Sequence, residues 1–272
     1  MGKKVCLLIV DPQFDFCDPT GKLSVTGADK DMERLAKMVS RSKGDIEETI
    51  VTLDSHRSLH IAHPIWWVDK DGNHPVPFEG GLPTIISIAD VTGPDPKWKA
   101  MNPAYQQRSV EYIQKLEANG RYALCVWPPH CLIGSGGYQV QPVLFEALCE
   151  WEEQFAAVNY VTKGSNIFTE HYSAVQADVF DPEDPGTGLN TDLIKTLQDM
   201  DVIAIAGEAS SHCVASTVKD IADNFGDDNV KKFLYLEDAC SPVPGCEALE
   251  KAFLDEMTGR GMQMSTTDKF LT

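Results

Sequence analysis

The stretch 202-VIAIAGEASSHCVASTVKDIADNF-225 predicts a strand, a turn and a helix in that order. Its first six residues are apolar or small, as in a buried strand, and the apolar residues after Cys213 recur at helical spacing. Cys213 would then lie at a helix N-terminus, where unpaired backbone N–H groups and the helix dipole favour a thiolate and can donate to an oxyanion. We interpret Cys213 as a candidate nucleophile; the alternative is a reduced cysteine packed in the core.

The same alternation of strand and helix runs through most of the chain. Strands are predicted at 4–12, 48–53, 122–127, 159–162, 202–207 and 232–236, with a final strand at 262–266; helices are predicted at 30–38, 141–155, 192–199, 213–225 and 246–261. Repeated strand–helix units predict an α/β fold in which helices cover both faces of a mostly parallel sheet, that is, a three-layer α/β/α sandwich.

Between residues 63 and 123 this alternation stops. Segments 69–78 and 91–98 have the composition of turns and loops, and one helix is predicted at about 103–118. We therefore expect a single domain over residues 1–272, with a loop and helix insertion at about 64–120 after the second strand. Trp66 and Trp67 would either line the entrance of a pocket or pack inside this insertion.

Composition excludes several classes of partner. The net charge of −18 argues against binding to nucleic acid or to an anionic membrane surface, because phosphate groups would be repelled. No stretch approaches the ~18 apolar residues of a membrane span. The first apolar run ends after six residues at Asp11, which favours a strand over a signal peptide. Eight cysteines without a CxxC pair are expected to be reduced thiols in a cytoplasmic protein. The oligomeric state stays open, and a homo-oligomer is compatible with the sequence.

Polar residues follow several of the predicted strands. The carboxyl ends of parallel strands form the ligand-binding edge of an open α/β sheet. Asp11, Lys163 and Cys213 follow three such strands. A carboxylate can take the proton of a thiol, and an ammonium group can stabilise the thiolate, so this set suits nucleophilic catalysis. Taken singly, Asp11 is equally typical of a turn and Lys163 of a solvated strand end.

A second group of polar residues has the donors of a divalent metal site. Asp54 and His56 follow the strand at 48–53, His130 follows the strand at 122–127, and His60 or His63 lies nearby. Carboxylate oxygen and imidazole nitrogen are ligands of zinc and similar ions. The alternative is a hydrogen-bonded Asp–His pair that ends a strand.

These segments together resemble the nicotinamidases of the isochorismatase-like cysteine hydrolase superfamily. The matching motifs occur in family order: DPQFDFC at 11–17, GKLSVTGA at 21–28, DSHRSLH at 54–60, WPPHC at 127–131, KG at 163–164, YSA at 172–174 and GEASSHCV at 207–214. The chain departs from the family pattern at Glu208, where an apolar residue is usual, at Ser211-His212, where Asp and an aromatic residue are usual, and after His60, where Ile61-Ala-His63 replaces Ser-Phe.

The resemblance implies a six-stranded parallel sheet and a specific reaction. Nicotinamide would be hydrolysed to nicotinate and ammonia through a thioester on Cys213, and pyrazinamide would be a further substrate. Asp11 would be the general base, and Lys163 would support the thiolate. The oxyanion hole would be formed by the amides of Ala209 and Cys213, after a cis peptide bond between Glu208 and Ala209.

The resemblance also implies a metal and a ring site. One divalent ion, Zn with Fe or Mn as alternatives, would be held by Asp54, His56 and His130, with His60 as an accessory ligand. Phe16 and Trp127 would flank the substrate ring.

Other functions remain open at this point. One is a related cysteine amidohydrolase for another small amide, of the maleamate, carbamoyl or biuret type. Another is a hydrolase in which metal-bound water attacks and Cys213 is incidental. A third is a non-catalytic binding protein on the same scaffold.

Overall fold

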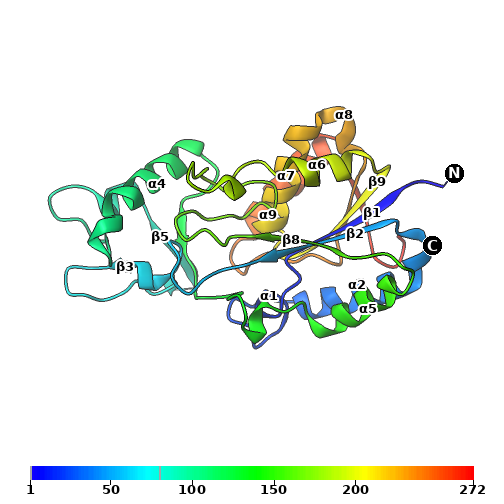
Figure 1. Ribbon diagram of the computed structural model, residues 1–272, viewed down its shortest axis with the longest axis horizontal. Helices are drawn as coiled ribbons and strands as arrows, with labels where there is room; N and C mark the ends of the chain where they lie inside the picture. The colour runs from blue at the N-terminus through cyan, green and yellow to red at the C-terminus, as the bar shows by residue number, and fades with distance from the viewer. Residues whose placement is uncertain (1, 80) are drawn as a thin grey trace.

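A sheet of six parallel strands forms the centre of the computed structural model, which describes residues 2–79 and 81–272 (Figure 1). The strand order is β11-β10-β9-β1-β2-β8, and every neighbouring pair is parallel. The strands are β1 (Val5–Val10), β2 (Glu48–Asp54), β8 (Asn159–Lys163), β9 (Val202–Gly207), β10 (Phe233–Leu236) and β11 (Gln263–Ser265). The predicted α/β fold with a six-stranded parallel sheet is confirmed.

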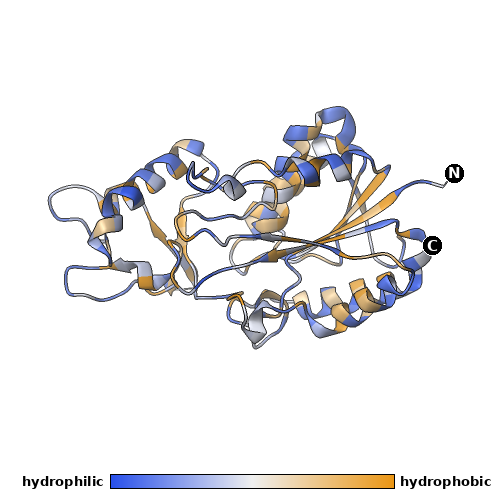
Figure 2. Cartoon of the chain, viewed as in Figure 1, coloured by the Kyte–Doolittle hydropathy of each residue, from blue (hydrophilic) through white to orange (hydrophobic). Residues whose placement is uncertain are grey.

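Helices cover both faces of this sheet, as a buried parallel sheet requires. All six residues of β1 are buried, and β1 lies between β9 and β2. Helices α2 (Ala28–Ser42) and α5 (Pro142–Glu152) pack side by side on one face, and helices α6 (Thr191–Gln198), α7 (Cys213–Phe225) and α9 (Glu247–Gly259) lie on the other (Figure 1). Apolar residues are concentrated in the strands and on the inner sides of the helices (Figure 2). Short helices α1 (Phe14–Cys17) and α8 (Asp227–Val230) complete this part.

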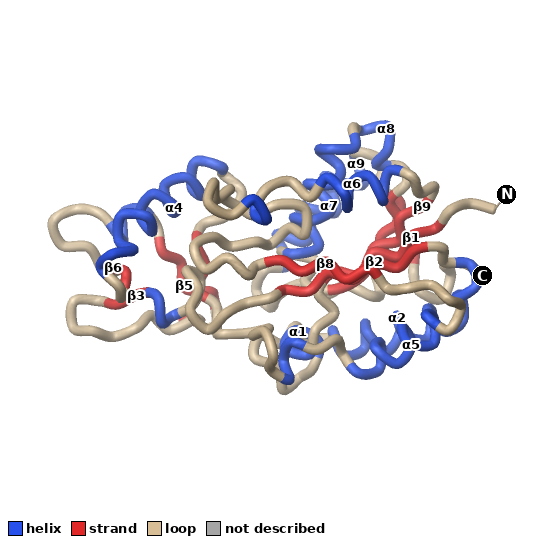
Figure 3. Tube along the Cα trace, in the orientation of Figure 1, coloured by secondary structure: helices blue, strands red, loops and turns tan. Residues whose placement is uncertain are grey.

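Residues 64–126 lie beyond the end of the main sheet and contain two small antiparallel sheets (Figure 3). One pairs β3 (Trp67–Val68) with β6 (Lys99–Ala100), and the other joins β4 (Phe78–Glu79), β5 (Leu82–Ile86) and β7 (Leu124–Val126). Along the chain, helix α3 (Ile88–Val91) lies between β5 and β6, and helix α4 (Gln106–Asn119) lies between β6 and β7. Trp66 donates to Ser109 and Trp67 to the carbonyl of Ile61, and both rings are buried, so they form the core of this region.

One strand lies in a different sheet from the one that the sequence predicts. The segment at 122–127 does contain a strand, β7, but β7 pairs antiparallel with β5 and not with the parallel strands. β7 pairs with the edge of β5, and the chain then returns to the main sheet at β8. His130 therefore reaches the site from a loop that runs beside His56: His56 donates its N–H to the carbonyl of Cys131, and Ile133 donates to the carbonyl of His56.

Among the helices of residues 2–79 and 81–272, none combines the length and the apolarity needed to cross a bilayer.

Candidate active site

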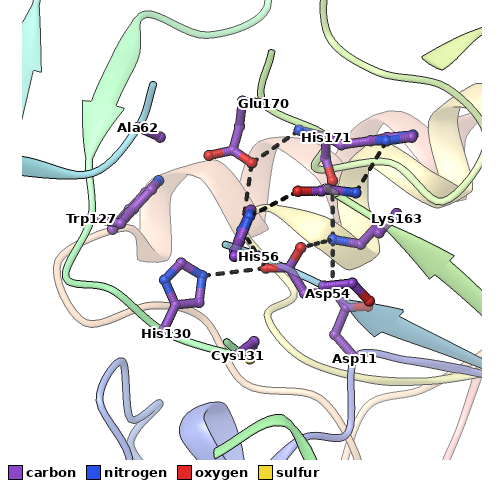
Figure 4. Close-up of polar contacts among 12 residues, drawn as sticks. Asp11, Asp54, His56, Ala62, Trp127, His130, Cys131, Lys163, Glu170 and His171 are labelled. Atoms are coloured by element: carbon purple, nitrogen blue, oxygen red, sulfur yellow. Dashed lines mark hydrogen bonds and ion pairs between the residues drawn. The ribbon is translucent and has the colours of Figure 1, made fainter. Parts of the chain in front are cut away.

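The ends of four parallel strands bring the predicted catalytic and metal-binding side chains together. The pairing register places Val10 opposite Gly207 and Asp54 opposite Lys163, so these strands end at the same level. The direction of strand addition reverses on the two sides of β1, which is where open α/β sheets bind ligands. Asp11, Asp54 and Lys163 meet at this edge (Figure 4).

Lys163 is the centre of this arrangement. Its Nζ lies 2.9 Å from Asp11 Oδ2, 3.1 Å from Asp54 Oδ1 and 3.6 Å from Cys213 Sγ. All four side chains are buried. Burial favours the neutral amine, but the two carboxylates outweigh it and raise the pKa of Lys163 well above its usual value. Lys163 is therefore a permanent cation that joins the thiol to both carboxylates.

Cys213 is the first residue of α7, as the sequence predicts, but the helix start alone does not make it a thiolate. Burial raises the pKa of the Cys213 thiol well above its usual value, although Lys163 opposes this shift. Burial also raises the pKa of Asp11, again against Lys163. The Asp11 carboxylate and the Cys213 thiol lie on the same ammonium group, with Asp11 Oδ2 at 2.9 Å and Cys213 Sγ at 3.6 Å from Lys163 Nζ. Both groups of a possible acid–base pair therefore meet at Lys163 in a buried site.

Backbone and side-chain contacts fix the orientation of Asp11. Its φ of 45° lies in the left-handed region, which is uncommon for an aspartate and typical of functional sites. The Asp11 N–H donates to Thr52 Oγ1 at 3.0 Å, and the Thr52 hydroxyl donates back to Asp11 Oδ1. Sequence reasoning missed Thr52, because nothing in a strand pattern marks which inward-facing residue will touch a neighbouring strand end.

The turn before Cys213 brings the amides of two residues that line a pocket, Ala209 and Cys213, within reach of a ligand. In the structure as described, neither Ala209 nor Cys213 donates its backbone N–H to another group. The peptide bond between Glu208 and Ala209 is cis. Gly207 is required where the turn starts, because its φ is 113° and a Cβ there would lie 2.0 Å from the carbonyl oxygen of Val10.

Asp54, His56 and His130 place three ligand atoms around one position. Asp54 Oδ2 lies 3.0 Å from His56 Nε2 and 3.3 Å from His130 Nε2 (Figure 4). The Nδ1 atoms of both rings face backbone carbonyls, of Gly164 at 3.1 Å and of Pro128 at 2.8 Å. An Nδ1–H that donates to a carbonyl leaves Nε2 as the metal-binding atom, which is the usual outer-shell arrangement of histidine ligands.

The charges of this group also suit a cation. Burial alone would raise the pKa of Asp54, but His56 and Lys163 hold it well below its usual value. Burial would lower the pKa of His56, but the Asp54 carboxylate raises it to about 9. A divalent ion would replace the proton on His56 Nε2. It would also neutralise the Asp54 carboxylate, which pairs with the same Lys163 ammonium group as Asp11 does. The donor set therefore fits a zinc-type ion.

His60 and His63 differ in the atom that they present to this cluster. His63 Nδ1 faces the carbonyl of Ser58 at 3.1 Å, so the neutral ring carries its lone pair on Nε2. His60 Nδ1 accepts the amide of Ala62 at 3.2 Å, so its Nε2 carries a hydrogen. Burial lowers the pKa of His63 to about 3 and that of His60 well below its usual value, so both rings are neutral. Of the two, His63 presents the donor that a metal needs.

One pocket contains both groups. Its lining includes the Cys213 thiol, Ala209 of the preceding turn, the three predicted metal ligands and several apolar side chains. The lining residues are Phe16, Leu23, Asp54, His56, Trp127, His130, Glu170, Tyr172, Ala209, His212, Cys213 and Val243. Phe16 and Trp127, the predicted ring contacts, both belong to it. Trp127 is held by a 2.9 Å hydrogen bond to Tyr172 and contacts Phe78 of β4, so residues beyond the main sheet support the pocket wall.

Sequence reasoning missed two further residues of this site. Glu170 is buried in the pocket wall, 3.9 Å from His56 Nε2, and its Oε2 finds no hydrogen-bond partner within residues 2–79 and 81–272. Gln13 forms two hydrogen bonds with the backbone of Asp54, at 2.7 and 2.8 Å, and so fixes the end of β2. Glu170 lies in a long loop after β8 without a periodic pattern, and Gln13 acts through a residue 41 positions away.

Comparisons with known proteins bear on the fold. No family model matches the sequence, and no curated protein matches it. Solved structures do match over nearly the whole chain. Yeast nicotinamidase covers 96% of this chain and 98% of its own at a TM-score of 0.64 and 20% identity. The Acinetobacter baumanii nicotinamidase/pyrazinamidase covers 100% of both chains at a TM-score of 0.62 and 21% identity.

The fold is that of the nicotinamidases. A third structure with this nicotinamidase fold is a pyrazinamidase of Pyrococcus horikoshii in complex with zinc, which matches at a TM-score of 0.56 and 19% identity and covers 97% of this chain and 99% of its own. At these identities the likeness establishes the fold alone, so the chemistry of the chain has to be argued from its own residues.

Proposed function

We propose that this protein is an amidohydrolase that converts nicotinamide to nicotinate and ammonia through a thioester on Cys213. The observation that supports it is the shared pocket: a thiol with an acid and an ammonium group lies beside a group of metal ligands, within an apolar wall. Nicotinamide is flat and can be bound at two chemical groups, its carboxamide and its ring nitrogen. The thiol with its acid and ammonium group would face the carboxamide, and the metal ligands would face the ring nitrogen.

Acylation begins with proton transfer from Cys213 Sγ to Asp11. The sulfur then attacks the carboxamide carbon, and the developing oxyanion accepts hydrogen bonds from the amides of Ala209 and Cys213. Each such donor is typically worth ~2.7–4 kcal/mol in the transition state. Asp11 returns the proton to the amide nitrogen, the C–N bond breaks, and ammonia leaves a thioester on Cys213. Lys163 stabilises the charged forms of both partners throughout.

Deacylation uses the same residues in reverse. Asp11 takes a proton from a water molecule, which attacks the thioester carbon, and the oxyanion again faces Ala209 and Cys213. The C–S bond breaks, the proton returns to sulfur, and nicotinate is released. One site thus splits a difficult amide hydrolysis into two easier displacements.

Asp54, His56 and His130, with His63 as a further donor, would hold one divalent ion, Zn in preference to Fe or Mn. When bound, this ion would supply a Lewis acid for the lone pair of the pyridine nitrogen and so orient the ring. Phe16 and Trp127 would contact the two sides of that ring.

The proposed function is tested by ammonia release from the purified, zinc-loaded protein. Nicotinamide and pyrazinamide are expected to be hydrolysed. Benzamide should be hydrolysed much more slowly, because it lacks the ring nitrogen that the metal site would bind. Maleamate, carbamoyl and biuret-type amides complete the panel. Turnover of one of these in preference to nicotinamide would replace the substrate assignment, and no turnover across the panel would contradict the enzymatic one.

Metal binding is expected to depend on His63 and much less on His60. His63→Ala should weaken Zn²⁺ binding at least about tenfold, because it removes a lone-pair donor, whereas His60→Ala removes only an N–H. Competition with a chromogenic chelator measures both affinities, and His56→Ala should abolish stoichiometric binding. The exposed His74 provides a matched control, His74→Ala. An equal loss in the His60 and His63 variants would contradict the assignment of ring protons given above.

A further inference from the structure

Glu208 is a buried acid, and no cationic side chain among the described residues pairs with it. It lies in the turn between β9 and α7, is fully buried, and is not among the residues that line the reaction pocket. Its Oε2 accepts the amide of Ser241 at 3.1 Å, whereas Oε1 receives no hydrogen bond from the described residues. Ser241 joins Glu208 to a second carboxyl group, that of Asp31 on α2, because the Ser241 hydroxyl donates to Asp31 Oδ2 at 2.6 Å.

Both carboxylate oxygens of Asp31 already accept hydrogen bonds. Its Oδ1 accepts from the Arg34 guanidinium, and its Oδ2 accepts from the Ser241 hydroxyl at 2.6 Å. Two carboxylates that share one serine repel each other, but one proton between them can make a strong hydrogen bond. Both oxygens of Asp31 already accept, whereas Glu208 Oε1 has no partner among the described residues, so a proton shared by the pair would belong to Glu208.

The other titratable groups around Glu208 give it no reason to ionise. They are Asp31 on α2, Glu250 on α9, Cys17 on α1, Tyr235 on β10 and Cys240 after β10, none of them a cation. The Arg34 guanidinium is directed to Asp31 and to the carbonyl of Asp238. Burial raises the pKa of Glu208 well above its usual value, and the Asp31 charge adds to this shift.

This pair of acids connects the nucleophile turn to the rest of the molecule through Ser241. The Ser241 amide donates to Glu208 and its hydroxyl donates to Asp31, while Ser210 donates its amide to the Ser241 carbonyl at 3.0 Å. Glu208 directly precedes Ala209, whose N–H has no acceptor among the described residues. A shift of this contact would therefore move the oxyanion donors.

We propose that Glu208 is a positioning residue that acts as a neutral acid: it donates a hydrogen bond to the Asp31 carboxylate and, with Ser241, holds the turn that presents Ala209 and Cys213. The positioning role of Glu208 rests on the proposed function, whereas its protonation state does not.

The protonation state is tested by the pH dependence of stability. A Glu that keeps its proton in the folded protein stabilises the folded state at low pH, and this contribution is lost as pH rises above the value at which the unfolded chain ionises, ~4.3. Glu208→Gln keeps a donor to Asp31 and an acceptor for Ser241 but does not titrate. The unfolding constant of the wild type relative to Glu208→Gln should thus rise by up to about tenfold per pH unit between pH 5 and 8. Other buried acids titrate in both proteins and cancel.

Infrared spectroscopy and a second variant give an independent readout. The spectrum of the wild type minus that of Glu208→Gln should show, at neutral pH, the C=O band of a buried carboxylic acid that shifts in D₂O. In Asp31→Asn the neighbouring charge is gone and an amide can donate to Glu208, so the pH-dependent difference should become smaller. A pH-independent stability difference, or no acid band, would overturn the neutral-acid assignment whether or not the protein hydrolyses amides.

Turnover tests the positioning role. Glu208→Gln should retain kcat within about threefold, whereas Glu208→Ala should lose about 10–100-fold in kcat with little change in KM, because the oxyanion donors shift without loss of substrate contacts. Equal kcat values in the two variants would overturn the positioning role.

Discussion

Cys213→Ala is expected to lower ammonia release from nicotinamide by about 10⁴–10⁶-fold, while the fold and the metal content stay unchanged. The reason is that the sulfur makes and breaks every covalent bond to the substrate in the proposed reaction, and alanine leaves only the oxyanion amides and the binding pocket. Steady-state assays at saturating substrate measure the effect, with circular dichroism and metal analysis on the same sample. Mass spectrometry of the acid-quenched wild type should detect the acylated Cys213 peptide.

Cys149→Ala serves as the matched control for this experiment, because Cys149 is an exposed thiol on α5. It should retain full activity. Substantial activity in Cys213→Ala would mean that water attacks the substrate directly and that the thioester route is wrong.

Lys163→Met is expected to have the largest effect on stability. The substitution keeps the length of the side chain but leaves the Asp11 and Asp54 carboxylates buried without their shared cation. Removing one partner of a buried ion pair typically costs about 3–5 kcal/mol, so the metal-free variant should unfold at a clearly lower urea concentration and be inactive. Urea unfolding followed by tryptophan fluorescence provides the measurement.

A second substitution separates the stability effect from the catalytic one. In Lys163→Met with Asp11→Asn, one of the two uncompensated charges is gone, so most of the lost stability should return while activity does not. Zinc should also stabilise Lys163→Met more than the wild type, since it neutralises Asp54. A double variant no more stable than Lys163→Met would show that charge is not the cause.

The residues at the ends of β1, β2, β8 and β9 could be predicted because period and position carry that information. A buried strand followed by a polar residue at the carboxyl edge is visible in the sequence, and four such ends meet by the geometry of a parallel sheet. The sheet to which β7 belongs was not predictable in this way. A three-residue apolar run has no feature that distinguishes a partner in the main sheet from the edge of β5, and β5 itself is interrupted by Pro83.

The supporting residues of the site could not be predicted for a different reason. Gln13, Thr52 and Glu170 act through contacts between segments far apart in the chain, and their own neighbours in sequence give no indication of them. The histidines show the same limit. Their number near Asp54 is visible in the sequence, but the ring atom that each one presents depends on which backbone group faces its Nδ1.

Since the ammonium of Lys163 touches Asp54 on one side and Asp11 and Cys213 on the other, the two halves of the site are thermodynamically linked. In the proposed enzyme, an ion that draws electron density from Asp54 would free that ammonium group to stabilise a thiolate, and by reciprocity the state of the sulfur would change the affinity of Asp54, His56 and His130 for the ion. Ion binding and thiol reactivity would therefore be coupled.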